Sequence, residues 1–281
     1  MTFTSYVGFM RDLEQVGIEY AADKAVALGF SGVEFLDMCC TGAPIDKEKH
    51  PAAAVRAALE KRGLTVDCYS VYAAVLAYDN ERFEREICEI IDYAAAVGAK
   101  LFHHTVMPYL KLEPDAPKYE EIFPKVLEIE RKIVKYCRER GLRCIFEPQG
   151  FYFNGVEGLS RLVNTLRGEG YDIGFCADLG NPVYVDSDPG DVIDAMSFCL
   201  AHVHVKDYIV SDESTGNRSE ARSLGGKYLL ELLPGEGQLD LGGYLGKLKA
   251  TGYDGRISLE YVADDEMMKK TMSYIAKLWE E

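Results

Sequence analysis

Two histidines and a lysine alternate with valines in AHVHVKD, residues 201–207. Side chains of a β-strand point alternately to its two faces, so Val203 and Val205 share one face. His202, His204 and Lys206 then share the opposite face, where a purely apolar core would leave them unsatisfied. This segment therefore predicts a strand whose polar face meets a metal ion, a ligand or solvent.

Three other apolar runs each place one carboxylate opposite their apolar side chains. These are Glu147 in CIFEPQ, Asp178 in GFCADLGN and Glu260 in RISLEYV. Three negative charges cannot share a buried pocket unless a cation or protons compensate them. Together with His204 they form a ligand set for one divalent ion. The oxygen-rich set favours Mn²⁺ or Mg²⁺, and the histidine also allows Co²⁺ or Zn²⁺.

Short β-branched or aromatic runs alternate with longer amphipathic segments along the whole chain, which is typical of repeated βα units. Several helical segments end at a glycine that a strand soon follows. Eight units over residues 1–281 predict a single-domain (β/α)₈ TIM barrel. A doubly wound sheet is the alternative, but only Gly8 follows the first strand where that fold needs a glycine-rich loop. The expected strands are residues 2–7, 32–37, 65–71, 100–106, 143–147, 172–178, 201–206 and 256–261.

A barrel brings the C-terminal ends of its strands to one mouth, where catalytic groups gather. The four ligand residues come from the fifth to the eighth strands and should converge there. Glu34 faces inward by the same alternation, whereas only one of the adjacent His103 and His104 can do so. Asp207 points away and suggests a loop anchor. The stretch 209–234 is expected to be an irregular loop on the active face.

Composition narrows the class of partner. The chain has 46 acidic and 31 basic residues, a formal charge of −15 and no basic cluster, which argues against nucleic-acid or anionic-membrane binding. The N-terminus lacks a secretory pattern and no segment is long enough to span a membrane, so a cytoplasmic protein is expected. Eight cysteines without C-x-x-C spacing suggest free buried thiols: Cys39, Cys40, Cys68, Cys88, Cys137, Cys144, Cys176 and Cys199.

The segments FEPQG, FCADLGN, AHVHVKDY and GYDGRISLEYV, with GFSGVEF near the N-terminus, resemble the sugar phosphate isomerase/epimerase group of the xylose isomerase-like barrels. The resemblance covers essentially the whole chain. It implies one divalent ion held by Glu147, Asp178, His204 and Glu260. One departure stands out: in ketose 3-epimerases a substrate-binding histidine occupies the position of Asn181, which puts 3-epimerase activity in doubt.

The resemblance implies isomerisation or epimerisation of a small sugar, sugar phosphate or sugar-derived keto compound. A base removes a proton next to a carbonyl while the metal stabilises the enediolate. Glu147 and Glu260 are the expected acid–base pair. A lyase or dehydratase of an inosose or keto-sugar is the alternative, followed by a phosphodiester hydrolase and a non-catalytic sugar-binding subunit. A homo-oligomer is compatible with the sequence. Expected substrate contacts are Asn181, Lys206, Glu34, His103 and His104.

Overall fold

A computed structural model describes residues 2–6, 8–37, 45–77, 80–260 and 264–281. The expected ends of the first and last strands, Val7 and Tyr261, lie outside these ranges, as do Cys39 and Cys40. The six cysteines within the ranges are free and buried, as the sequence predicted. No helix among the described residues is both long and apolar enough to cross a membrane.

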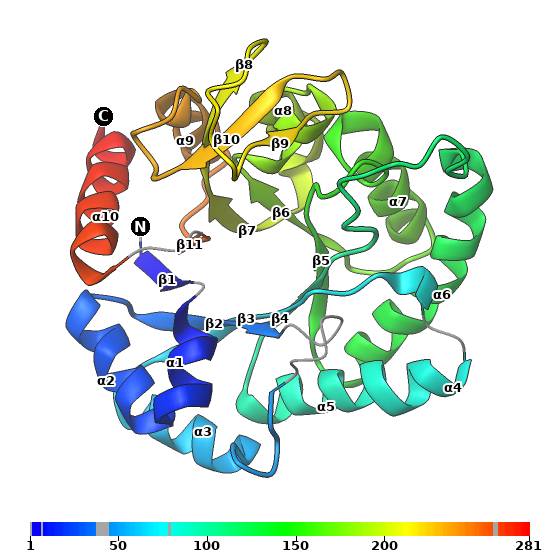
Figure 1. The fold of residues 1–281 in the computed structure, drawn as a ribbon. Coiled ribbons are helices and arrows are strands. Elements are labelled where there is room, and N and C mark those ends of the chain that lie inside the picture. The colour runs from blue at the N-terminus through cyan, green and yellow to red at the C-terminus, as the bar shows by residue number, and fades with distance from the viewer. Residues whose placement is uncertain (1, 7, 38–44, 78–79, 261–263) are drawn as a thin grey trace.

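Eight parallel strands form a barrel in the order β1-β11-β7-β6-β5-β4-β3-β2. The barrel closes between β1 and β2, where the Ser31 amide donates to the Phe3 carbonyl at 3.3 Å. Figure 1 shows the strands enclosed by a ring of helices, with β1 beside β2. The TIM barrel expected from the sequence is therefore present. Its strands are β1 Thr2–Tyr6, β2 Gly32–Asp37, β3 Thr65–Val71, β4 Leu101–His104, β5 Arg143–Phe146, β6 Gly174–Asp178, β7 Leu200–Val205 and β11 Arg256–Leu259.

Helices cover the outside of the barrel and leave its two ends open to loops. Two of them end where sequence reasoning placed a glycine cap: Gly29 and Gly98 both adopt the left-handed conformation, with φ of 94° and 93°. A π-helical turn, Phe83–Ile87, joins α4 to α5. The helices are α1 Gly8–Val16, α2 Ile18–Leu28, α3 Ala52–Glu60, α4 Asn80–Arg82, α5 Cys88–Val97, α6 Tyr119–Glu139, α7 Gly155–Gly168, α8 Pro189–Met196, α9 Leu241–Ala250 and α10 Asp265–Glu280.

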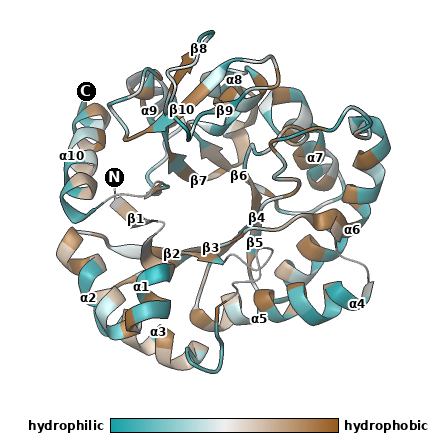
Figure 2. Cartoon of the chain, in the orientation of Figure 1, coloured by the Kyte–Doolittle hydropathy of each residue, from teal (hydrophilic) through white to brown (hydrophobic). Residues whose placement is uncertain are grey.

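Two apolar layers hold the barrel. The large outer layer lies between strands and helices and takes the outward residues of each strand, among them Phe35, Val203 and Val205. A small inner layer, made of Cys68, Ile145 and Cys176, fills the lumen. Figure 2 shows hydrophobic strands and helices whose colour alternates between hydrophobic and hydrophilic. Burying each helix's apolar stripe against the strands is the main stabilising contribution of such a fold.

The stretch 209–234, expected to be irregular, is not a plain loop. It contributes most of an antiparallel sheet in the order β8-β10-β9, formed by β8 Asp207–Ser211, β9 Ala221–Arg222 and β10 Tyr228–Leu232. This sheet, which we call the β8–β10 hairpin, projects from the barrel in Figure 1. The runs DYIVS and YLLEL pair with each other in register from Asp207–Leu232 to Ser211–Tyr228.

The root of this hairpin is closed by Asp207, which is 1% exposed. One carboxylate oxygen accepts the backbone N–H of Tyr208 at 2.9 Å and of Leu239 at 3.2 Å. The other accepts the N–H of Gly235 at 2.9 Å and of Gly237 at 3.0 Å. The glycine-rich segment PGEG therefore cradles an anion that the protein itself supplies.

Candidate metal centre

Four side chains from neighbouring strands meet at the C-terminal end of the barrel. In the β6–β7 ladder Asp178 pairs with His204, so these two lie level with each other. Glu147 directly follows β5, and Glu260 directly follows β11. One ligand atom from each of the four lies within 4.8 Å of the others. The structure therefore brings together the whole ligand set that strand alternation predicted.

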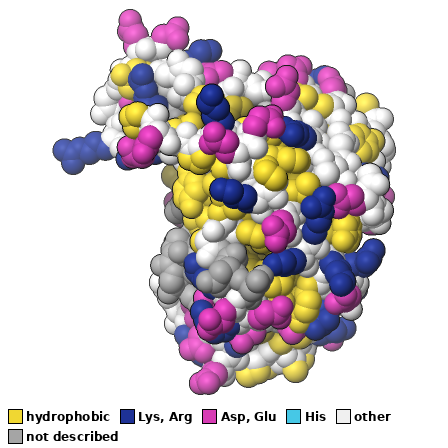
Figure 3. Space-filling view, turned by 90° about the vertical axis from the view of Figure 1, so that its right-hand side faces the viewer, with side chains coloured by type: hydrophobic (Ala, Val, Ile, Leu, Met, Phe, Trp, Pro, Cys, Tyr) yellow, Lys and Arg dark blue, Asp and Glu magenta, His cyan; other side chains and the backbone are white. Residues whose placement is uncertain are grey.

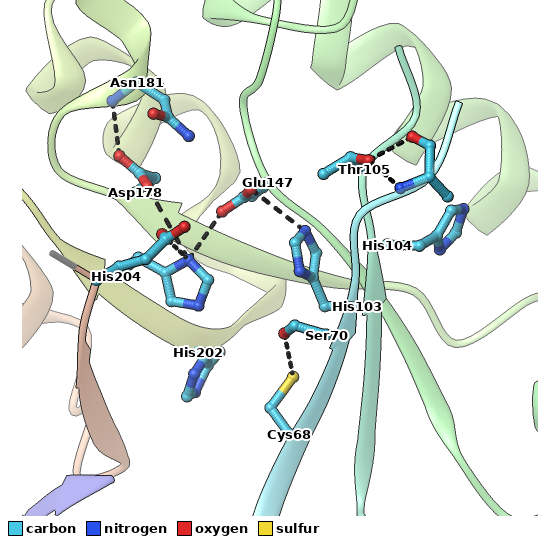
Figure 4. Close-up of polar contacts among 12 residues, drawn as sticks. Cys68, Ser70, His103, His104, Thr105, Glu147, Asp178, Asn181, His202 and His204 are labelled. Atoms are coloured by element: carbon cyan, nitrogen blue, oxygen red, sulfur yellow. Dashed lines mark hydrogen bonds and ion pairs between the residues drawn. The ribbon is translucent and has the colours of Figure 1, made fainter. Parts of the chain in front are cut away.

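His204 lies at the centre of this group (Figure 4). Its Nδ1 lies 2.8 Å from an oxygen of Glu147, 2.8 Å from an oxygen of Glu260 and 4.0 Å from Asp178 Oδ2. Its Nε2 lies 3.0 Å from Glu34 Oε1. Both ring nitrogens therefore lie within hydrogen-bond distance of carboxylate oxygens, and the surrounding negative groups outweigh burial and raise the pKa of His204 well above its ordinary 6.5. A metal ion bound at Nδ1 would take the place of the proton held there.

Asp178 is oriented by the chain that follows it. Its Oδ1 accepts the backbone N–H of Gly180 at 2.8 Å and of Asn181 at 2.6 Å. Two such bonds fix the carboxylate and leave Oδ2 directed at the site. This second oxygen is buried and lies 3.1 Å from Lys206 Nζ. Asp178 thus offers one preoriented oxygen to a cation.

Lys206 contacts two of the carboxylates at once. Its Nζ lies 3.1 Å from Asp178 Oδ2 and 3.0 Å from Glu260 Oε2, and it donates to Asn181 Oδ1 at 3.0 Å. That bond turns the Asn181 amide nitrogen away, and Nδ2 is buried without a protein acceptor in the described part of the chain. A buried donor of this kind is available to a substrate hydroxyl or carbonyl.

The charges of the site are unevenly distributed. Burial, reinforced by the neighbouring Glu260 carboxylate, raises the pKa of Glu147 to about 7. Burial also opposes ionisation of Glu260, but the cations of Lys206 and His204 outweigh it and hold its pKa at about 2. Near neutral pH Glu260 is therefore ionised while Glu147 is only partly so, and a bound cation would favour the ionised form of both. Three carboxylate oxygens and one imidazole nitrogen fit a divalent ion such as Mn²⁺, Mg²⁺, Co²⁺ or Zn²⁺.

A second polar layer lies below the four ligands. Glu34 accepts a hydrogen bond from Ser70 and contacts His202 Nε2 at 2.9 Å through its other oxygen. The ring of His202 is buried, so this contact is a hydrogen bond within the barrel core. Ser70 was not singled out from the sequence, although it alternates with the outward Tyr69 and Val71. Glu34 is buried, and its two carboxylate oxygens contact His204, His202 and Ser70.

The adjacent histidines of β4 point to opposite sides (Figure 4). His103 faces the lumen, and its Nε2 lies 3.4 Å from an oxygen of Glu147. His104 faces the outer layer, where its Nε2 lies 2.9 Å from a carboxylate oxygen of Glu130 on α6, and both side chains are fully buried. His103 therefore lies beside the site, whereas His104 lies outside it and cannot contact a substrate there, because successive residues of a strand cannot share a face.

Gln149 is a further polar residue near the site that sequence reasoning did not use. It lies two residues after Glu147, and its Oε1 is buried without a hydrogen-bond donor among the residues described. Both ring nitrogens of His103 are also buried without a hydrogen-bond partner among the residues described, and its Nε2 makes the ion-pair contact to Glu147. The position of Gln149 directly after a strand end was the available signal.

The chain belongs to the xylose isomerase-like TIM barrel family, whose model matches residues 22–278. A search of curated protein sequences finds no significant match.

Solved structures with the same fold include the E. coli 3-keto-D-glucoside 4-epimerase YcjR, with a TM-score of 0.72, 16% identity and coverage of 99% of both chains. The IolI protein, solved with a bound zinc atom, has a TM-score of 0.73 and 15% identity, covering 99% of this chain and 98% of that one. The probable 3-DHS dehydratase AsbF of Bacillus anthracis has a TM-score of 0.73 and 14% identity, covering 98% and 99%. At identities this low, the similarity shows a shared fold only, and the reaction has to be inferred from the side chains of the site.

Proposed function

We propose that this protein is a divalent-metal-dependent isomerase or epimerase of a small sugar, sugar phosphate or sugar-derived keto compound. One observation carries the proposal: Glu147, Asp178, His204 and Glu260 place their ligand atoms within 4.8 Å of one another at the mouth of a barrel. The zinc bound to the related IolI fold supports a metal in this kind of barrel. When bound, a divalent ion would polarise a substrate carbonyl and stabilise the negative charge that forms on its oxygen.

Glu147 and Glu260 are the proposed acid–base pair. They reach the site from β5 and β11, three strands apart in the barrel order, so a substrate between them meets a carboxyl group on each side. Glu260 keeps 20% of its side chain exposed, whereas Glu147 exposes 1%, so Glu260 is the one open to an arriving substrate. One carboxylate removes the proton next to the carbonyl, and the other returns a proton to the neighbouring atom.

The remaining polar groups would orient the substrate. Asn181 offers its free amide N–H to a hydroxyl or carbonyl oxygen, and Gln149 offers an acceptor. Lys206 keeps Asp178 and Glu260 in place and adds positive charge beside the developing oxyanion. Asn181 carries no proton that it can transfer, so both proton transfers fall to the two glutamates.

The experiment measures solvent deuterium exchange into keto-sugars, inososes and hydroxy-keto acids with Mn²⁺ or Mg²⁺ present. We expect exchange with one substrate class, and a loss of at least about 100-fold in Glu147→Gln and Glu260→Gln. Glu157→Gln, an exposed glutamate of α7, is the matched control and should retain full exchange. Full exchange in both site variants would exclude the acid–base assignment. Metal binding, followed by calorimetry, should weaken in Asp178→Asn.

Dehydration of a keto-sugar or inosose is the second candidate, because the dehydratase AsbF shares the fold and because the two reactions begin with the same proton removal. Product analysis distinguishes them. A dehydratase releases water and yields an unsaturated or diketo product, whereas an isomerase or epimerase conserves the mass of its substrate.

A further inference from the structure

A second concave site lies beside the barrel mouth, where β9 faces the segment that follows β4. The pocket has a volume of about 480 Å³, within the usual range for small-molecule sites. Tyr72, Pro108, Tyr109 and Leu110 line one side, and Ala221 and Arg222 line the other.

Barrel topology places this pocket across the mouth. The order β1-β11-β7-β6-β5-β4-β3-β2 puts β7, which carries the β8–β10 hairpin, four strands from β3. Strand β3 leads into Tyr72, which lines the pocket opposite the hairpin. The pocket is therefore lined by chain segments that follow strands on opposite sides of the barrel.

The pocket wall also touches the segment that carries Glu147. Gly150 has a φ of 66°, and a Cβ there would collide with the carbonyl oxygen of Met107 and approach that of Tyr109. The chain three residues beyond Glu147 thus packs directly on the backbone that forms the pocket wall. In this short segment Gln149, which follows Glu147 by two residues and precedes Gly150, has a buried Oε1 without a hydrogen-bond donor among the described residues.

Two large hydrophobic side chains of the pocket wall are exposed to solvent. Tyr109 is 47% exposed and Leu110 is 41% exposed, and both lie outside regular secondary structure. Figure 3 shows hydrophobic side chains gathered on one face of the molecule, with basic and acidic side chains scattered among them. Contiguous exposed apolar surface at a concave site indicates a binding partner with a flat, apolar face.

The pocket is lined by two cations, Lys111 and Arg222, and by one carboxylate, Glu220, so its lining carries a net positive charge on a chain whose formal charge is −15. The hydroxyls of Ser214 and Thr215 donate to the Glu220 carboxylate, both at 2.5 Å, and lower its pKa, with a smaller contribution from Arg222. Arg222 is held over the Tyr228 ring, 3.8 Å from its centroid. Positive charge in this setting favours an anionic group on the ligand.

We propose that this pocket is a distal subsite for a ring-sized unit that carries a carboxylate or phosphate and is linked to the reacting sugar. The substrate is then a conjugate of two units instead of a free monosaccharide. This inference rests on the proposed function, because the metal centre would bind the reacting unit. The aromatic wall receives the face of the distal ring, and Lys111 and Arg222 receive its charge.

The test uses three fragments of the distal unit: 4-hydroxybenzoate, phenyl phosphate and neutral benzyl alcohol. Their affinities for the full-length protein are measured by saturation-transfer NMR with Mg²⁺ present. We expect at least one anion to bind at least about fivefold more tightly than benzyl alcohol, and its identity distinguishes carboxylate from phosphate. Arg222→Ala should abolish this preference, whereas Arg218→Ala, a cation of the same hairpin that does not line the pocket, should preserve it.

A second measurement tests the link to the metal centre. Mn²⁺ bound there should broaden the NMR signals of the pocket-bound fragment, because a linked substrate requires the two sites to be close. Equal affinity of all fragments, an unchanged preference in Arg222→Ala, or no broadening by bound Mn²⁺ would each overturn the subsite. Conversion of an oligomer to a monomer by Tyr109→Ala would also overturn it by assigning the surface to a second copy. A failure of wild-type protein to bind any divalent ion would instead overturn the proposed function.

Discussion

The loss of stability caused by removing the Glu130 carboxylate should depend on pH in a defined way. Glu130 and His104 are both fully buried between β4 and α6, 2.9 Å apart. Burial opposes the charged imidazole, but the Glu130 carboxylate outweighs it, and the pKa of His104 rises from its ordinary 6.5 to about 10. A rise of this size corresponds to about 3–5 kcal/mol of stability.

The sign follows from the raised pKa. The stabilisation is fully present below pH 6.5, where the unfolded histidine is also protonated, and it is lost as the pH rises through about 10. In Glu130→Gln the buried imidazole has no counter-ion and stays neutral. We expect the free energy of unfolding of this variant to be lower than that of the unmutated protein by about 3–5 kcal/mol at pH 6 and by under about 2 kcal/mol at pH 9. The gap between the two proteins shrinks by about 1.4 kcal/mol per pH unit above neutrality.

The assay is urea unfolding at pH 6, 7.5 and 9, with Glu128→Gln on the exposed side of α6 as the matched control. The control should change the free energy of unfolding by less than about 0.5 kcal/mol at every pH. The reasoning fails if Glu130→Gln costs the same at pH 6 and pH 9, or if it costs no more than the control.

Three further predictions follow from the structure. Asp207→Ala leaves four backbone N–H groups without their acceptor, so it should lower the midpoint of thermal unfolding and increase protease cleavage within the β8–β10 hairpin. Gly150→Ala forces a Cβ against the Met107 carbonyl at a positive φ, and we expect a loss of about 1–3 kcal/mol in urea unfolding. Adding Mn²⁺ should raise the unfolding temperature and chelation should reverse the rise, whereas Asp178→Asn should abolish most of the response.

Strand alternation was sufficient to predict most of the candidate site. The inward faces of β5, β6, β7 and β11 follow from local sequence, because side-chain direction in a strand has a strict period of two. Contacts between strands could not be predicted in this way. They depend on the register of strands far apart in the chain, as when Lys206 bridges Asp178 and Glu260 or when Glu34 contacts His204.

The β8–β10 hairpin shows a second limit of sequence reasoning. Its strands pair with each other beyond the barrel, and their residues Asp207–Ser211 and Tyr228–Leu232 are separated by a polar segment that resembles an ordinary loop. The glycine-rich PGEG segment has the composition of a loop that binds an external phosphate. Its N–H groups bind Asp207, a partner about thirty positions earlier that no local pattern could reveal.

The closed root formed by Asp207 makes the hairpin an exchangeable module. The chain leaves β7 and returns toward α9 at this one carboxylate, and farther out the hairpin is tied to the segment after β6, because Asp186 accepts hydrogen bonds from Ser223 and from the Gly225 N–H. A transplanted hairpin that kept both attachments would therefore replace the pocket wall contributed by β9 without moving His204. Related barrels could diversify their substrates by this route, with recognition evolving separately from chemistry.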